Sequence, residues 1–294
     1  MEIFGVPTQA LFGQLLIGLI NGSFYALLSL GLAVIFGLLN IINFSHGAQY
    51  MMGAFVAYLV LNKFGIGYWW SLVLSPILVG ITGVIVERTM LFRLYKVDHM
   101  YGLLLTLGLA LIIEGLFRNE FGSSGQPYPI PPELTGGQNL GFMFLPNYRA
   151  WVIGMSLVVC LATWYVIERT KLGGYLRAAT ENPQLVQAFG INVPRMITLT
   201  YGFGVALAAL GGVMAAPIYQ VSPQMGANLI IVVFAVVVIG GMGSILGTIV
   251  TGFGLGLIEG LTKVFYPEAS NTVIFVIMAI VLLVKPAGLF GTEK

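Results

Sequence analysis

Long runs of apolar residues fill most of the chain, and short clusters of charged residues, glycine, proline or asparagine interrupt them. A helix that crosses the apolar core of a bilayer needs about 20 mostly apolar residues. Runs that approach this length predict helical spans at 11–39, 47–61, 69–86, 101–117, 150–167, 197–216, 229–241, 245–261 and 272–284. The first run is long enough for one tilted helix or for a broken pair, and the pattern leaves both open.

Charged residues are scarce and unevenly placed. They make up 8% of the 294 residues, and none lies within 3–62 or 196–258. Soluble domains carry about 25%. The pattern therefore predicts an all-α fold: a polytopic transmembrane bundle of about 8–10 helices, with interrupted helices, forming a single membrane domain over 1–294. The net charge of +2 is too small to indicate a nucleic-acid partner.

The positions of lysine and arginine predict the orientation, because cytoplasmic loops are enriched in both. One set of loops holds nine of the 13 basic residues: Arg88, Arg93, Lys96, Arg169, Lys171, Arg177, Arg195, Lys285 and Lys294. These loops and the C-terminus are expected in the cytoplasm. The N-terminus is then outside if the first run is one helix, and inside if it is two. The loop over about 118–149, rich in glycine and proline, is expected to form an irregular external cap with room for a hairpin.

A polar cluster interrupts the first apolar region. Five polar side chains lie between two apolar runs, at Asn40, Asn43, Ser45, His46 and Gln49. In hydrocarbon, polar groups must be satisfied by protein or face water. One interpretation is a helix break that lines a solute path. The other is a short cytoplasmic turn in which asparagine and serine cap the next helix.

A second interruption is rich in glycine, at 240–247. Its spacing is wrong for a dinucleotide-binding loop, and no suitable strand–helix unit surrounds it. A helix break or a close helix crossing suits it better, so Gly241, Gly243 and Ser244 join the predicted path. Interrupted segments in both halves of a chain point to a translocation site. Small residues at four-residue spacing, at 204, 208, 212 and 216 and at 252, 256 and 260, predict tight helix packing.

Residues for catalysis or metal binding are few. The chain has two histidines, His46 and His99, and one cysteine, Cys160, inside an apolar run. No pattern indicates a catalytic set or a metal site. Glu114 and Arg118 are expected to pair on one helix face, as are Glu259 and Lys263. No series of intramembrane acids crosses the bilayer, which disfavours a proton-driven carrier, and the chain is not expected to be an enzyme.

A cytoplasmic segment, about 168–196, carries a short helix with defined ends. Asn182 can cap a helix that starts at Pro183, and Gly190 can end it. Such a helix presents Leu185, Val186 and Phe189 to water. An apolar side on so short a helix needs a partner groove or its own membrane domain to cover it.

Four motifs resemble permeases of the branched-chain amino acid ABC uptake family: 42–47 (Ile-Asn-Phe-Ser-His-Gly), 177–183 with 189–192, 240–244 and 285–290. The resemblance runs nearly end to end. It implies a second permease subunit, two cytoplasmic ATPases that carry ATP and Mg²⁺, an external solute-binding protein, and no cofactor on this chain. It also implies a bacterial inner-membrane location and a coupling role for the short cytoplasmic helix, at Glu181, Asn182, Leu185, Val186, Phe189 and Gly190.

The expected function is therefore import of branched-chain or related amino acids by alternating access, driven by separate ATPases. Related permeases handle urea, amides or aromatic acids, so the solute stays open. The chain has no Gly-x4-Gly-Lys-Ser/Thr loop of its own to bind a nucleotide. A secondary carrier or channel that works alone is the main rival. A membrane enzyme and a purely structural subunit are weaker ones.

Overall fold

The structure is a computed structural model that describes residues 2–3, 5–39, 42–95, 97–291. Each of the predicted spans corresponds to one helix: α1 (Thr8–Leu39), α2 (His46–Phe64), α3 (Tyr68–Thr89), α4 (His99–Phe121), α5 (Asn147–Arg169), α8 (Val193–Ala215), α9 (Ala227–Gly240), α10 (Ile245–Phe265) and α11 (Val273–Val284). The expected all-α bundle is confirmed.

The first apolar run forms one continuous helix of 32 residues, which answers the question left open by the sequence. Six helices, α1, α3, α4, α5, α8 and α10, are long and apolar enough to cross a membrane by length and composition. The apolar window of α1 is 83% buried, whereas that of α4 is 6% buried. α1 is therefore the central helix, and α4 presents its apolar side chains at the periphery of the bundle.

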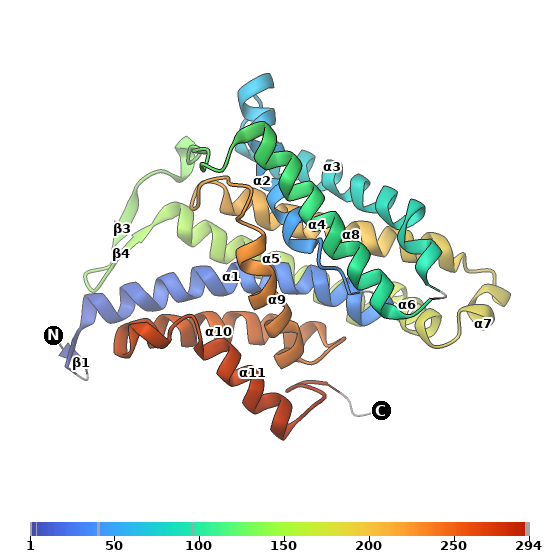
Figure 1. Cartoon of the computed structure of the whole chain (residues 1–294). Coiled ribbons are helices and arrows are strands. Elements are labelled where there is room, and N and C mark those ends of the chain that lie inside the picture. Colours follow the sequence, from blue (N-terminus) through green and yellow to red (C-terminus); the bar gives the residue numbers. More distant parts are fainter. Residues whose placement is uncertain (1, 4, 40–41, 96, 292–294) are drawn as a thin grey trace.

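Small residues let α1 approach α10, and α8 approach α2, closely. A Cβ on Gly256 of α10 would lie 2.4 Å from the carbonyl oxygen of Gly18 of α1, and one on Gly212 of α8 would lie 2.0 Å from the carbonyl oxygen of Tyr50. In lipid, where apolar burial does not drive association, such backbone contacts supply the packing energy. The two predicted stripes of small residues therefore hold the helices together, and α1 and α10 run side by side in Figure 1.

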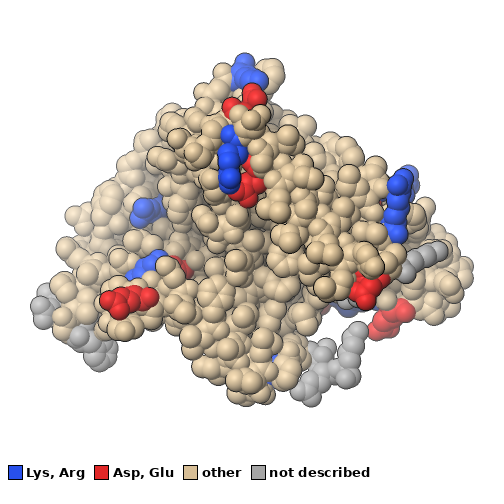
Figure 2. All heavy atoms as spheres, viewed as in Figure 1, with Lys and Arg blue, Asp and Glu red and all other residues tan. Residues whose placement is uncertain are grey.

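The loops lie at opposite ends of the bundle. The loop between α4 and α5, predicted to be external, contains the 3₁₀ turn η2 (Pro132–Leu134) and a hairpin of β3 (Gly137–Asn139) and β4 (Phe144–Pro146). At the other end, on the right of Figure 1, lie α6 (Lys171–Glu181) and α7 (Pro183–Ala188). In Figure 2 most of the visible surface consists of uncharged residues, and the charged side chains are few and separated. A surface in contact with lipid requires this composition.

The remaining elements are short. Two 3₁₀ turns, η1 (Leu91–Leu94) and η3 (Pro267–Ala269), follow α3 and α10. At the N-terminus, β1 (Glu2–Ile3) pairs with β2 (Val6–Pro7) in an antiparallel sheet that the sequence analysis did not predict. The ion pair of Glu114 with Arg118 is confirmed.

Candidate functional site: a helix junction near mid-depth in the membrane

α2 and α9 both begin inside the bundle, and their first residues meet. The backbone of Gly47, in the first turn of α2, touches that of Gly226, just before α9: a Cβ on Gly226 would lie 1.9 Å from the carbonyl oxygen of Gly47. From this junction α2 runs to Phe64 and the start of α3, while α9 runs the other way to the turn before α10. Both predicted interruptions therefore lie next to helices that start within the membrane.

Contacts with α1 give the depth of the junction. A helix of 32 residues is about 48 Å long. The apolar core of a bilayer is about 30 Å thick, so the middle third of α1 lies within it. His46 Nε2 lies 3.0 Å from the carbonyl oxygen of Leu28, and Ser29 Oγ donates to the carbonyl oxygen of Val233 at 3.1 Å. The junction therefore lies near mid-depth, a little toward the C-terminal end of α1.

The polar cluster satisfies its own hydrogen bonds. Asn43 Oδ1 accepts from the backbone N–H of Ser45 at 3.1 Å and from its hydroxyl at 2.6 Å. The Asn43 amide donates to Gln49 Oε1 at 3.0 Å, and the Gln49 amide donates to Ser45 Oγ at 3.1 Å. All three side chains are buried. They stabilise a non-helical turn inside the membrane, where unpaired backbone groups would be costly.

Thr106 of α4 supports the same turn from the other side. Its hydroxyl donates to the carbonyl oxygen of Ile42 and accepts from the backbone N–H of Phe44, both at 3.1 Å. His46 is fully buried, and its Nδ1 atom has no hydrogen-bond partner among the described residues. Asn40, also assigned to the path, lies outside the described residues.

The other predicted path residues lie elsewhere. Gly241 and Gly243 have φ of 102° and 92° in the turn between α9 and α10, and Ser244 caps α10 by accepting from the N–H of Gly247 at 3.1 Å. Gly243 touches Gly37 of α1, nine residues beyond Leu28 and so about 14 Å further along the helix. The structure does not bring the two predicted groups of path residues together.

The turn between α9 and α10 is held by the C-terminal segment, a contact that sequence reasoning missed. The N–H of Leu289 donates to the carbonyl oxygen of Ile239 at 2.8 Å, and the N–H of Phe290 donates to that of Gly240 at 3.1 Å. Together with Arg177 and Glu168, which form an ion pair at 3.4 Å, this region lines a cavity of about 400 Å³ at the end of the bundle that holds α6.

A second cavity, of about 310 Å³, lies at the level of the junction, and we call it the central cavity. Its wall comes from α1, the first turns of α2 and α9, and the segment before α9: Asn21, Phe24, Tyr25, Tyr50, Tyr219, Gln220, Ser222, Met225, Asn228 and Leu229. None of these residues is among those predicted from the sequence. Asn21, Tyr25 and Asn228 are polar residues in stretches of the chain that carry no charge. Such isolated polar residues are the sequence signal that could have found them.

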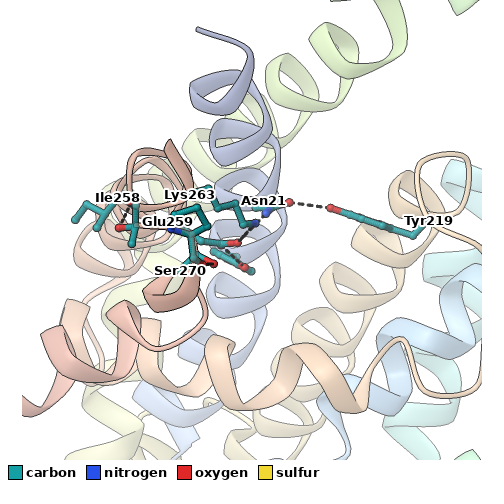
Figure 3. A network of polar contacts seen from close by, with 9 residues as sticks. Asn21, Tyr219, Ile258, Glu259, Lys263 and Ser270 are labelled. Carbon is teal, nitrogen blue, oxygen red and sulfur yellow. Dashed lines mark hydrogen bonds and ion pairs between the residues drawn. The ribbon is translucent and has the colours of Figure 1, made fainter. Parts of the chain in front are cut away.

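A network of polar contacts lies beside the central cavity (Figure 3). Tyr219 donates to Asn21 Oδ1 at 2.8 Å, and Asn21 donates to Glu259 Oε1 at 3.2 Å. Tyr25 donates to Glu259 Oε2 at 2.7 Å, and Lys263 pairs with the same carboxylate. The predicted pair of Glu259 and Lys263 is therefore confirmed, and it is part of a larger network that joins α1, α10 and the segment before α9.

The short helix α7 has the predicted ends. Asn182 Oδ1 accepts from the N–H of Leu185 at 3.0 Å, α7 starts at Pro183, and Gly190 follows with φ of 82°. Leu185 and Phe189 are 54% and 78% exposed, as expected, and Glu181 and Asn182 are exposed beside them.

Val186 differs from the expectation that it faces water, because it is 7% exposed and packs against Ala179 and Val193. A helix of six residues that lies on its neighbours must turn one side inward, and Val186 is on that side. Within the described ranges, no three His, Cys, Asp or Glu side chains gather closely enough to hold a metal ion.

Comparison with known proteins decides the family. Residues 14–282 match the family model described as the permease component of branched-chain amino acid transport systems. The chain belongs to this family. It is 29% identical to the high-affinity branched-chain amino acid transport permease LivH of Escherichia coli strain K12 and 28% identical to BraD of Pseudomonas aeruginosa, with 96% of each chain covered in both cases. No solved structure matches.

The family also includes more distant relatives of this chain. It is 26% identical to LivM of Escherichia coli, over 92% of this chain and 68% of LivM. As a member of the branched-chain amino acid transport permease family, the chain is a multi-pass membrane protein and a transport component. The resemblance that the four sequence motifs indicated is confirmed.

Proposed function

We propose that this chain is the membrane-spanning permease subunit of an ABC importer for branched-chain amino acids. It moves solute by alternating access, while separate ATPase subunits hydrolyse ATP and an external protein delivers the solute. The relatives LivH and BraD carry this function in their names, and they align with nearly the whole chain. The homology with LivM supports a second, non-identical permease subunit as the partner in the membrane.

The observation that carries the proposal is the junction of α2 and α9. Two helices that start inside the membrane, next to a cavity with polar walls, are the arrangement by which transporters expose a solute site at mid-depth. α1 is one helix, so the orientation predicted from the basic loops puts the N-terminus outside and the C-terminus in the cytoplasm.

Coupling to the ATPase is assigned to α7. Leu185 and Phe189 leave a large apolar area in water, and Val186 anchors the same helix to the start of α8. A push on the exposed side of α7 is therefore transmitted to α8, which packs along α1, α2 and α3. ATP binding can shift the permease between its states only to the extent that the ATP-bound ATPases bind one permease state more tightly than the other.

The test is uptake by the complete complex in proteoliposomes, with leucine, isoleucine and valine beside alanine, phenylalanine and urea. In this complex Phe189→Asp should abolish uptake and reduce ATPase association, because a carboxylate replaces the most exposed apolar contact of α7. The control Gln187→Asp adds the same charge on the same helix without removing an apolar side chain. Normal uptake by Phe189→Asp, or uptake without any ATPase, would refute the coupling assignment.

A further inference from the structure

The central cavity lies at the midpoint of the bundle. Asn21, Phe24 and Tyr25 line it, and residues 23 and 24 are the middle of α1. Polar side chains at such depth are costly unless protein or water satisfies them. A volume of about 310 Å³ is at the lower end of the range for small-molecule sites, so it suits a single small solute.

Part of the cavity wall is already committed to hydrogen bonds and part is free. Asn21, Tyr25 and Tyr219 belong to the network of Glu259. Among the described residues, the side chains of Tyr50, Gln220, Ser222 and Asn228 make no hydrogen bond with the protein. Tyr50 is the informative case, because it is 1% exposed and lines the cavity. The Tyr50 side chain is almost wholly covered by protein, and its hydroxyl, which has no hydrogen-bond partner in the described part of the protein, is left to bond with what occupies the cavity.

The charge of the wall selects the ligand. Within the described part of the chain no charged side chain lines the cavity, and the nearby Glu259 carboxylate already receives three donors. A cation or a dianion would therefore remain uncompensated. Met225, Asn228 and Leu229 place the first turn of α9, the positive end of its dipole, on one side of the cavity. That side favours one carboxylate.

The cavity also has an apolar surface, which Phe24, Met225 and Leu229 form. The ring of Phe24 meets that of Tyr219 edge to face at 5.7 Å between centroids, so the aromatic wall is fixed in place. The free oxygen of Gln220 and the faces of these rings can receive an ammonium group.

We propose that the central cavity binds the transported amino acid during its passage. Its carboxylate lies at the first turn of α9 and receives hydrogen bonds from Tyr50, Ser222 and Asn228. Its aliphatic side chain lies against Phe24, Met225 and Leu229. This inference rests on the proposed function, and it adds a solute site within the permease to the specificity of the external binding protein.

The test measures binding of radiolabelled L-leucine to the purified permease–ATPase complex without the external binding protein. Wild type should bind leucine, and Tyr50→Phe should weaken binding about tenfold or more, because it removes one donor to a charged group. Leucinamide, which lacks the carboxylate, should bind more weakly to wild type and should be insensitive to Tyr50→Phe. Asn228→Leu is a second variant at an exposed position, with the same expected pattern.

The matched control is Tyr58→Phe. Tyr58 lies on the same helix, its hydroxyl donates to Gln126 at 3.2 Å, and it lies outside the cavity wall. Leucine binding should be unchanged in this variant. Equal leucine affinity of wild type, Tyr50→Phe and Asn228→Leu would overturn the assignment, as would a wild-type complex that imports leucine but does not bind it alone. Failure of the complete wild-type system to import any branched-chain amino acid would instead refute the proposed function.

Discussion

Two groups of polar side chains lie close together near the centre of the bundle, and their hydrogen bonds differ. Asn43, Ser45 and Gln49 bond to one another and hold the turn before α2. Tyr50, the residue after Gln49 on α2, lines the central cavity with a hydroxyl that has no partner among the described residues. The difference teaches that a polar side chain in a membrane span can serve the backbone or the solute, and that its hydrogen bonds distinguish the two.

The largest effect is expected at the junction that both groups share. Gly226→Ala places a Cβ against the carbonyl oxygen of Gly47, and backbone cannot move aside as a side chain can. We expect a loss of about 3 kcal/mol in the free energy of unfolding, measured by denaturation in detergent. The control is Gly108→Ala on α4, where nothing lies within 4 Å of the added methyl group. Equal stability of the two variants would contradict the close approach of α2 and α9.

The next effect concerns the internally bonded group. Asn43→Leu removes the acceptor of the Ser45 hydroxyl and the donor to Gln49 Oε1 in a buried site, so we expect a loss of about 2 kcal/mol in the free energy of unfolding. Leucine affinity of the molecules that remain folded should not change. The control Asn62→Leu removes an exposed side chain that bonds only to the backbone of Tyr58. Weakened leucine affinity with unchanged stability in Asn43→Leu would place Asn43 with the cavity wall instead.

A smaller effect is expected in the network beside the cavity. Glu259→Gln keeps the shape but replaces one acceptor oxygen with a donor and removes the charge that Lys263 meets. We expect a loss of about 1–2 kcal/mol in the free energy of unfolding. The control Glu114→Gln breaks a pair on one helix face, which is worth about 0.3–0.5 kcal/mol. Similar losses in both variants would show that the network adds nothing beyond a surface pair.

The smallest effect on stability is expected where the effect on binding is largest. Tyr50→Phe removes a hydroxyl without a protein partner, so the free energy of unfolding should change by less than about 0.5 kcal/mol. The control is Tyr148→Phe, which removes a hydroxyl that donates to the carbonyl oxygen of Met214 at 2.8 Å and should cost about 1 kcal/mol. A large loss of stability in Tyr50→Phe would place its hydroxyl in the structural group.

The helices themselves could be predicted because each rule involved is local. An apolar run of sufficient length, free of charge, has few alternatives to a helix in lipid, and every predicted run became one. The caps of α7 followed in the same way from Asn182, Pro183 and Gly190. The ion pairs of α4 and α10 followed from four-residue spacing. The inward turn of Val186 could not be predicted in this way, because it depends on Ala179 and Val193 of neighbouring helices.

By itself, the sequence determined the membrane location, the helices, the stripes of small residues at which helices pack closely, and the family. Hydropathy, residue spacing and motif identity are properties of the chain alone. Only the tertiary structure decided which polar residues face a cavity. Asn21, Tyr50 and Asn228 come from three different helices, and the central cavity exists only where these helices converge. The physical reason is that a hydrogen-bond partner is a matter of position in space, whereas the sequence reports only that a polar group must find one.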